Sequence, residues 1–414
     1  MLIKQACRVT LWGLLGLLIA FPAVVVAASA FEGVRFSGFG TVGLVHGGDE
    51  VLGYRRDLSH DGVFDNDWSF KPDTLLGLQF DVPLAENFDA ALQLVAKDRL
   101  ENNLSESLEW AYLRYRPTHE LALRGGRLGL DLFMLSEYRN LGFSYLWARP
   151  PIEFYGLVYY NHYDGVDIAY ETGLEEGLFR ARLFAGNSKG AVSTQFTDIE
   201  VDLEPLVGFT LGWEFDRWQA RLGFSTLKQS QSKQASSQLT GALRSVVGLW
   251  PEATEIADEL ESNGRRLNYF SAGFAYDQNP WTVQSELSYI DSEYKVFSSV
   301  WSAYLSLGRR IGPVTVYGLG ALAENPDGRV QVPSAPPALV GLQQQVQAFY
   351  DLSSVKQHSL SLGMRWDIRY DLALKAQWDH TWVDQYGGLL WLQKQPLVED
   401  RSLDTFSVNL NFLF

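Results

Sequence analysis

Basic side chains fall on the same face, by alternation, in three neighbouring segments of the chain. Lys97 ends the first segment, Arg114 and Arg116 lie in the second, and Arg124 lies in the third. Alternate residues of an extended chain share one face, so these four cations are expected to line the same side of a sheet. Fixed charges on such a wall orient and filter polar solutes without any bond-making step.

The segment that follows, residues 131–161, mixes charges of both signs with many aromatic residues. Its charged candidates are Asp131, Glu137, Arg139, Arg149 and Glu153. Pro150 and Pro151 stiffen its second half, because proline fixes the backbone φ angle. Arg127, just before this segment, has the opposite parity to Arg124. It therefore needs a bulge at residues 125–126 or a position at the outer rim of the sheet.

Signals for catalysis are weak. Gly38, Gly40 and Gly43 formally match a dinucleotide-binding fingerprint, but no helix is expected after them, and small residues beside a subunit contact or an inward loop explain them better. The six histidines show no metal-ligand spacing, and no Gly-x-Ser-x-Gly motif occurs. We expect no enzyme, no metal and no cofactor. The enzymatic alternative is a Ser/His/Asn hydrolase barrel similar to outer-membrane phospholipase, with His162 or His380 as the histidine.

The first 30 residues predict export. Lys4 and Arg8 precede an apolar run over residues 9–21, and Ala28-Ser29-Ala30 has the small-x-small pattern that signal peptidase cleaves. The apolar run is shorter than the roughly 20 residues of a spanning helix, which argues against a membrane anchor. The only cysteine, Cys7, would leave with this segment, so residues 31–414 would form one domain without disulfides.

Composition narrows the class further. The chain carries 49 acidic against 34 basic side chains, which argues against a nucleic-acid binder because such proteins need a cationic face. The mean hydropathy of −0.09 is too low for a polytopic helical membrane protein, and no stretch after residue 30 holds 18 uninterrupted apolar residues. Acidic clusters in the predicted loops could bind divalent cations, but no calcium-loop spacing occurs and solvated acid is the better interpretation.

A period of two runs through the chain after residue 30. At the C-terminus Phe406, Val408, Leu410, Phe412 and Phe414 alternate with polar residues, and close to a dozen other segments of about ten residues repeat the pattern. One face suits lipid and the other largely suits water. Ten residues is also the length that a tilted strand needs to cross a bilayer.

The connections between these segments alternate in length. Short ones with turn residues are expected at residues 83–87, 117–120, 173–177, 216–217, 277–280, 312–313 and 369–371. Longer ones are expected at residues 46–72, 100–106, 131–161, 187–205, 228–266, 291–296, 324–356 and 384–402. Aromatic residues such as Trp218, Trp281 and Trp366 gather beside the short turns. Together these patterns predict an all-β, sixteen-stranded antiparallel transmembrane barrel with short periplasmic turns and long external loops.

The chain resembles the Gram-negative outer-membrane porins. The resemblance is carried by the opening Val34-Arg35-Phe36-Ser37-Gly38-Phe39-Gly40, by the closing segment at residues 407–414, and by the sequence of strands and loops. Phe412 and the terminal Phe414 are similar to the barrel-assembly signal of that class. The resemblance covers essentially all of residues 31–414 and is one of architecture.

The resemblance implies a function and a site. In porins the loop after the fifth strand folds into the barrel and narrows it, so residues 131–161 would form a constriction opposite the basic wall of Lys97, Arg114, Arg116 and Arg124. The chain lacks the Pro-Glu-Phe-Gly run common in general porins, which leaves the path of the loop open. The family implies an outer-membrane homotrimer, in contact with lipid and lipopolysaccharide, for passive diffusion of small hydrophilic solutes and ions.

Several alternatives remain open from the sequence. A substrate-selective channel, with long loops narrowing its mouth, is the second hypothesis. The lumen wall has mixed charge, so the sequence does not decide between cation and anion preference, and it names neither the solute nor a gate. Residues 251–263 predict one helix in the fifth long loop, with Ile256 and Leu260 four residues apart.

Overall fold

The computed structural model describes residues 33–100, 104–194, 198–230, 236–261 and 264–414. The expected export signal at residues 1–30 lies outside these ranges. Among the described residues, no helix is both long and apolar enough to cross a membrane.

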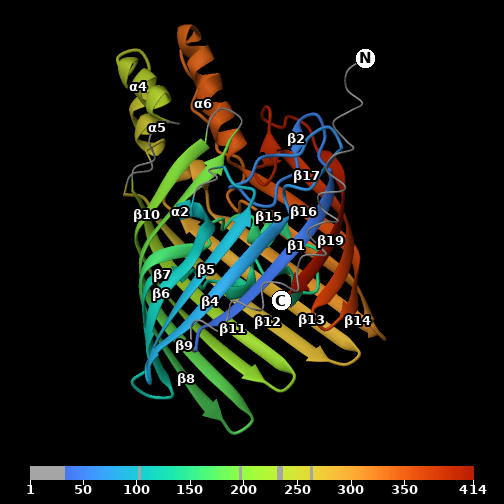
Figure 1. Ribbon diagram of the computed structural model, residues 1–414. Coiled ribbons are helices and arrows are strands. Elements are labelled where there is room, and N and C mark those ends of the chain that lie inside the picture. The colour runs from blue at the N-terminus through green and yellow to red at the C-terminus, as the bar shows by residue number, and fades with distance from the viewer. Residues whose placement is uncertain (1–32, 101–103, 195–197, 231–235, 262–263) are drawn as a thin grey trace, which may run out of the picture.

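Sixteen antiparallel strands of the described chain close into a barrel, as predicted (Figure 1). Strand β1 (Arg35–Gly47) pairs with β19 (Arg401–Leu413) and so joins the two ends of the sheet. The strands between them are β4 (Leu75–Ala85), β5 (Phe88–Lys97), β6 (Leu108–Tyr115), β7 (Leu121–Gly129), β8 (His162–Leu174), β9 (Gly177–Ser193), β10 (Asp198–Phe215), β11 (Trp218–Ser230), β12 (Arg266–Gln278), β13 (Trp281–Ser292), β14 (Val300–Ile311), β15 (Val314–Glu324), β16 (Val355–Arg369) and β17 (Leu372–Gly388).

The two faces of the wall differ as the alternation predicts. On β19 the side chains of Phe406 and Val408 are 45% and 43% exposed, whereas Ser407 and Asn409 are buried. The apolar set therefore points out of the barrel and the polar set points into its lumen. This distribution gives every second strand residue an environment fit for lipid.

Glycines on β1 make room for aromatic rings at the seam that closes the barrel. A Cβ atom at Gly38 would lie 2.2 Å from the ring of Phe414, and one at Gly40 would lie 2.4 Å from the ring of Phe412. The rings of the terminal strand thus cover the glycines of the first strand. This contact accounts for glycine at positions 38 and 40, whereas a Cβ atom at Gly43 would lie 2.4 Å from the side chain of Asp73, just before β4.

The sorting of connections by length holds, with one correction. Short turns join β4 to β5, β6 to β7, β8 to β9, β10 to β11, β12 to β13, β14 to β15 and β16 to β17, at the places predicted. The long loop predicted at residues 187–205 is wrong: β9 and β10 continue as a paired ladder to Ser193 and Asp198. A register irregularity between Leu203 and Leu206 accommodates Pro205, which lacks a backbone N–H, so the strand continues past it.

Most helices and minor strands lie at the long-loop end of the barrel. The helix predicted at residues 251–263 is present but shorter, as α5 (Ala253–Glu259), and α4 (Ser237–Ser245) and α6 (Val340–Leu352), which were not predicted, stand beside it at the top of Figure 1. Leu243, Ile256 and Val346 lie in one buried cluster that joins these helices. The remaining elements are short: α2 (Leu104–Ser107), α3 (Ile152–Tyr155), β2 (Leu52–Gly53), β3 (Asp67–Ser69) and β18 (Leu392–Gln393).

Candidate functional site: a loop across the barrel lumen

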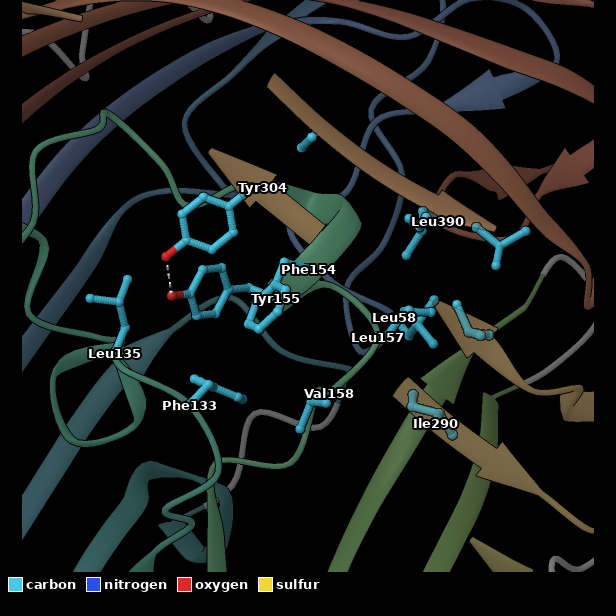
Figure 2. Close-up of a cluster of buried hydrophobic side chains, with 14 of the residues drawn as sticks. Leu58, Phe133, Leu135, Phe154, Tyr155, Leu157, Val158, Ile290, Tyr304 and Leu390 are labelled. Atoms are coloured by element: carbon cyan, nitrogen blue, oxygen red, sulfur yellow. Dashed lines mark hydrogen bonds between the residues drawn. The ribbon is translucent and has the colours of Figure 1, made fainter. Parts of the chain in front are cut away.

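The connection between β7 and β8, residues 130–161, folds into the barrel. Its side chains Phe133, Phe154 and Tyr155 pack in the lumen together with Tyr304 of β14 and with residues from other long loops (Figure 2). We call this segment the lumen loop. It is the connection that the sequence placed after the fifth strand.

Polar side chains of the wall hold one half of the lumen loop through its backbone. Lys375 of β17 donates to the carbonyl oxygens of Gly142, at 2.6 Å, and Trp147, at 2.9 Å. Asn409 of β19 donates to the carbonyl of Ala148 at 2.6 Å, and Arg365 of β16 donates to that of Phe143 at 2.7 Å. Buried carbonyl groups need such donors, so the polar lumen face of these strands has a structural role.

The other half of the loop is held by a network of charges. Asp131 accepts hydrogen bonds from Arg182 of β9, at 2.6 Å, and from Arg221 of β11. Burial disfavours the charged carboxylate, but Arg182 and Arg221 outweigh it and lower the pKa of Asp131 from 3.8 to about 2. Asp131 is therefore an anion at neutral pH, and two cations from the wall hold it in the lumen.

The charge network continues on both sides of Asp131. Arg182 also lies 2.8 Å from Glu137 of the loop and 3.9 Å from Asp167 of β8. Asp167 accepts a hydrogen bond from Arg124 at 2.6 Å. Arg124 and Arg182 of the wall thus form one connected set with Asp167 of the wall and with Asp131 and Glu137 of the loop.

A further contact joins the middle of the loop to β5. Lys97 of β5 donates to the side-chain oxygen of Asn140 at 3.2 Å and lies 3.6 Å from Glu109 of β6. The loop is thus attached to β9 through Asp131 and to β17 through the carbonyls of Gly142 and Trp147. Because β9 and β17 lie eight strands apart in the closed sheet of sixteen, the loop spans the lumen.

Arg114 and Arg116 lie at the short-turn end of the barrel, and Arg127 lies at its long-loop rim. Arg114 and Arg116 both pair with Asp89, at 2.8 and 2.6 Å, near the short turn between β4 and β5. Arg127 pairs with Asp164 at 2.8 Å, near the long-loop end of β7. Asp164 shares its face with the outward Val166, so Arg127 takes the outer-rim position rather than forming a bulge.

Three of the predicted loop charges are buried supports of the loop. Arg139 donates to the carbonyl of Tyr155 at 2.8 Å and lies 3.3 Å from Asp57. Arg149 pairs with Asp379 at 2.5 Å. Glu153 accepts a hydrogen bond from Gln357 at 2.9 Å, and burial raises its pKa. These side chains fasten the loop to other segments.

A buried hydrogen-bond centre that the sequence did not single out joins the loop to β13 and β14. Glu286 accepts hydrogen bonds from the backbone N–H of Met134, at 2.8 Å, from the hydroxyl of Tyr304, at 2.7 Å, and from the hydroxyl of Tyr155. Glu286 lies on the lumen face by parity, which was the one signal for it. Its partners come from distant parts of the chain, so the sequence could not reveal them.

The two histidines of the hydrolase alternative occupy different surroundings. His380 Nδ1 lies 2.8 Å from Asp404 and its ring packs against Trp382 on the outward face. His162 lies 3.8 Å from Glu109. No group of three potential metal-binding side chains occurs among the described residues.

Comparison with known proteins finds similar solved structures but no similar sequence. No family model and no curated protein sequence matches the chain. Solved structures do match over nearly the whole length. OmpF of Salmonella typhi, in complex with daunomycin, gives a TM-score of 0.53 at 10% identity, covering 92% of this chain and 97% of that one. The outer-membrane channel DcaP of Acinetobacter baumannii gives 0.53 at 11% identity, covering 93% and 98%. The barrel therefore has the porin fold.

Proposed function

We propose that this protein is an outer-membrane channel through which small hydrophilic solutes and ions diffuse passively, without a chemical step. The observation that carries the proposal is the lumen loop, which enters a closed barrel and is bonded to opposite parts of its wall. A loop in this position reduces the cross-section that a solute can use. Porin-like architecture, with polar side chains facing inward, supports the same function.

The charge network supplies the means of filtering. Arg182 of the wall lies 2.6 Å from Asp131 and 2.8 Å from Glu137 of the loop, and Arg124 pairs with Asp167 beside it. These charges would create a transverse electric field where the loop meets the wall. We assign solute contact to Arg114, Arg116, Arg124 and Glu137, and loop support to the buried Lys97, Asp131, Arg139, Arg149 and Glu153. A polar solute would be oriented by this field before it passes.

The amount of side-chain packing in the lumen favours the substrate-selective form of the channel. Trp147 and Phe154 of the lumen loop are buried against wall residues such as Tyr304. A wide general pore would leave such side chains in water. We therefore propose restricted permeability, in a barrel that lies in the outer membrane against lipid and lipopolysaccharide and assembles as a homotrimer.

Solute uptake into liposomes tests the function. Residues 31–414 are refolded into proteoliposomes, and swelling is recorded in isotonic arabinose, glucose and sucrose. We expect swelling faster than in protein-free liposomes, with rates that fall as the solute becomes larger. Swelling no faster than in protein-free liposomes with all three sugars would contradict a passive hydrophilic channel.

A further inference from the structure

An apolar cavity of about 820 Å³ lies beside the lumen loop at the long-loop end of the barrel. Leu132 and Val158 of the loop form part of its lining, and Leu203 and Leu206 of β10 form another part. Segment 389–396 and helix α6 also line it, with Phe349 as the largest side chain from that helix. We call this space the vestibule cavity.

The side chains that line the vestibule cavity are more apolar than those of the lumen below it. Leu227, Leu267, Tyr269 and Ile290 occupy lumen-facing positions of β11, β12 and β13, where water-filled channels carry polar residues. Arg55 is the only charged side chain among the described lining residues. Its guanidinium donates to the carbonyls of Ser193, at 2.8 Å, and Leu389, at 2.5 Å, so its hydrogen-bonding capacity is largely used within the protein.

Three buried polar atoms of lining residues have no hydrogen-bond partner among the described residues. They are Nε1 of Trp391, a donor, Oε1 of Gln393, an acceptor, and the hydroxyl of Tyr269, which can do either. Trp391 and Gln393 are 2% and 5% exposed. An unpaired buried polar group costs free energy, and a ligand that bonds to it removes that cost.

These observations fit one class of ligand. A cavity of this volume matches the size of small-molecule sites, which are mainly apolar with a few polar groups that fix orientation. A charged molecule would lose hydration without gaining an ion pair there. A neutral molecule with a ring system and a hydroxyl or carbonyl group would bury the rings and bond to Trp391 or Gln393.

We propose that the vestibule cavity binds a neutral aromatic or alicyclic solute that carries a hydroxyl or carbonyl group. It would be the first binding site that the solute reaches before the lumen loop. The proposal rests on the channel function and narrows its solute class. Part of the cavity lining belongs to the lumen loop, so a bound solute contacts the element that restricts passage.

Binding of 2-naphthol tests the proposal in nanodiscs that hold the full mature chain. Val201→Trp fills the cavity from β10, and Val207→Trp places the same side chain on the outward face of that strand. We expect saturable binding that Val201→Trp weakens about tenfold or more, a loss of at least about 1.4 kcal/mol, while Val207→Trp leaves it unchanged. Equal binding by both variants would overturn the proposal, because it would indicate partition into lipid.

If Val201→Trp does not fold, the affinities for 2-naphthol and naphthalene are compared instead. Wild type should bind 2-naphthol about fivefold more tightly than naphthalene, as one hydrogen bond allows, and Gln393→Met should reduce this preference. No saturable binding of 2-naphthol by a preparation that swells liposomes in arabinose would overturn this inference and leave the channel function standing. Failure of the swelling itself would instead contradict the channel function.

Discussion

Neutralising Asp131 should loosen the lumen loop without unfolding the barrel. The substitution Asp131→Asn keeps the size of the side chain but leaves Arg182 and Arg221 facing each other without their shared anion. The pKa of Asp131 is about 2 instead of 3.8, which corresponds to about 2 kcal/mol of stabilisation by these partners. Losing about 2 kcal/mol makes the released loop about thirtyfold more populated relative to the attached one.

Single-channel recording in planar bilayers measures this release as current noise within the open state and as a change in mean conductance. Glu137→Gln is the matched control, because Glu137 contacts the same Arg182 but its side chain is 40% exposed and contributes less. We expect Asp131→Asn to raise the noise well above that of the wild type and of Glu137→Gln. Conductance and noise identical to those of the wild type would refute the assignment of Asp131 as a loop attachment.

Three further predictions concern assembly, pH and selectivity. Gly40→Val should reduce the folded fraction on heat-modifiable gel electrophoresis, since its side chain would collide with Phe412 at a cost of about 1–3 kcal/mol. Gly318→Ala should not, because its Cβ atom would make only ordinary van der Waals contact, 3.7 Å from Leu362; equal folding of the two variants would refute the seam packing. The pKa of Asp131 in the folded protein lies below its ordinary value, so the ionised carboxylate stabilises the attached loop above about pH 4 and this stabilisation is lost as pH falls towards 2. We therefore expect current noise to rise between about pH 4 and pH 2; constant noise down to pH 2 would contradict this. Arg124→Gln should shift the reversal potential in a salt gradient towards cation selectivity, and an unchanged potential would remove Arg124 from the constriction.

The barrel could be predicted because its signals are local. Alternation along β19 and turn residues such as Pro313 act within a few positions, so strand number, facing and most connections followed from the sequence. The extended hairpin of β9 and β10 was missed because its polar residues and Pro205 are typical of loops. Backbone pairing, rather than side-chain pattern, makes that segment a strand.

The site was predicted less completely because its partners are distant in sequence. Asp131 was expected in the lumen, but its pairing with Arg182 depends on how the loop enters it. The vestibule cavity combines several loops, and only the apolar residues at lumen positions, such as Leu227 and Ile290, pointed to it. Spatial closure of the barrel, which no local pattern encodes, brings these residues together.

The central hypothesis is that residues 31–414 form a water-filled channel narrowed by the lumen loop. Adding the refolded chain to a planar bilayer in 1 M potassium chloride tests this most directly. We expect discrete conductance steps of uniform size. The absence of any step, in preparations whose heat-modifiable mobility shows a folded barrel, would contradict the channel function.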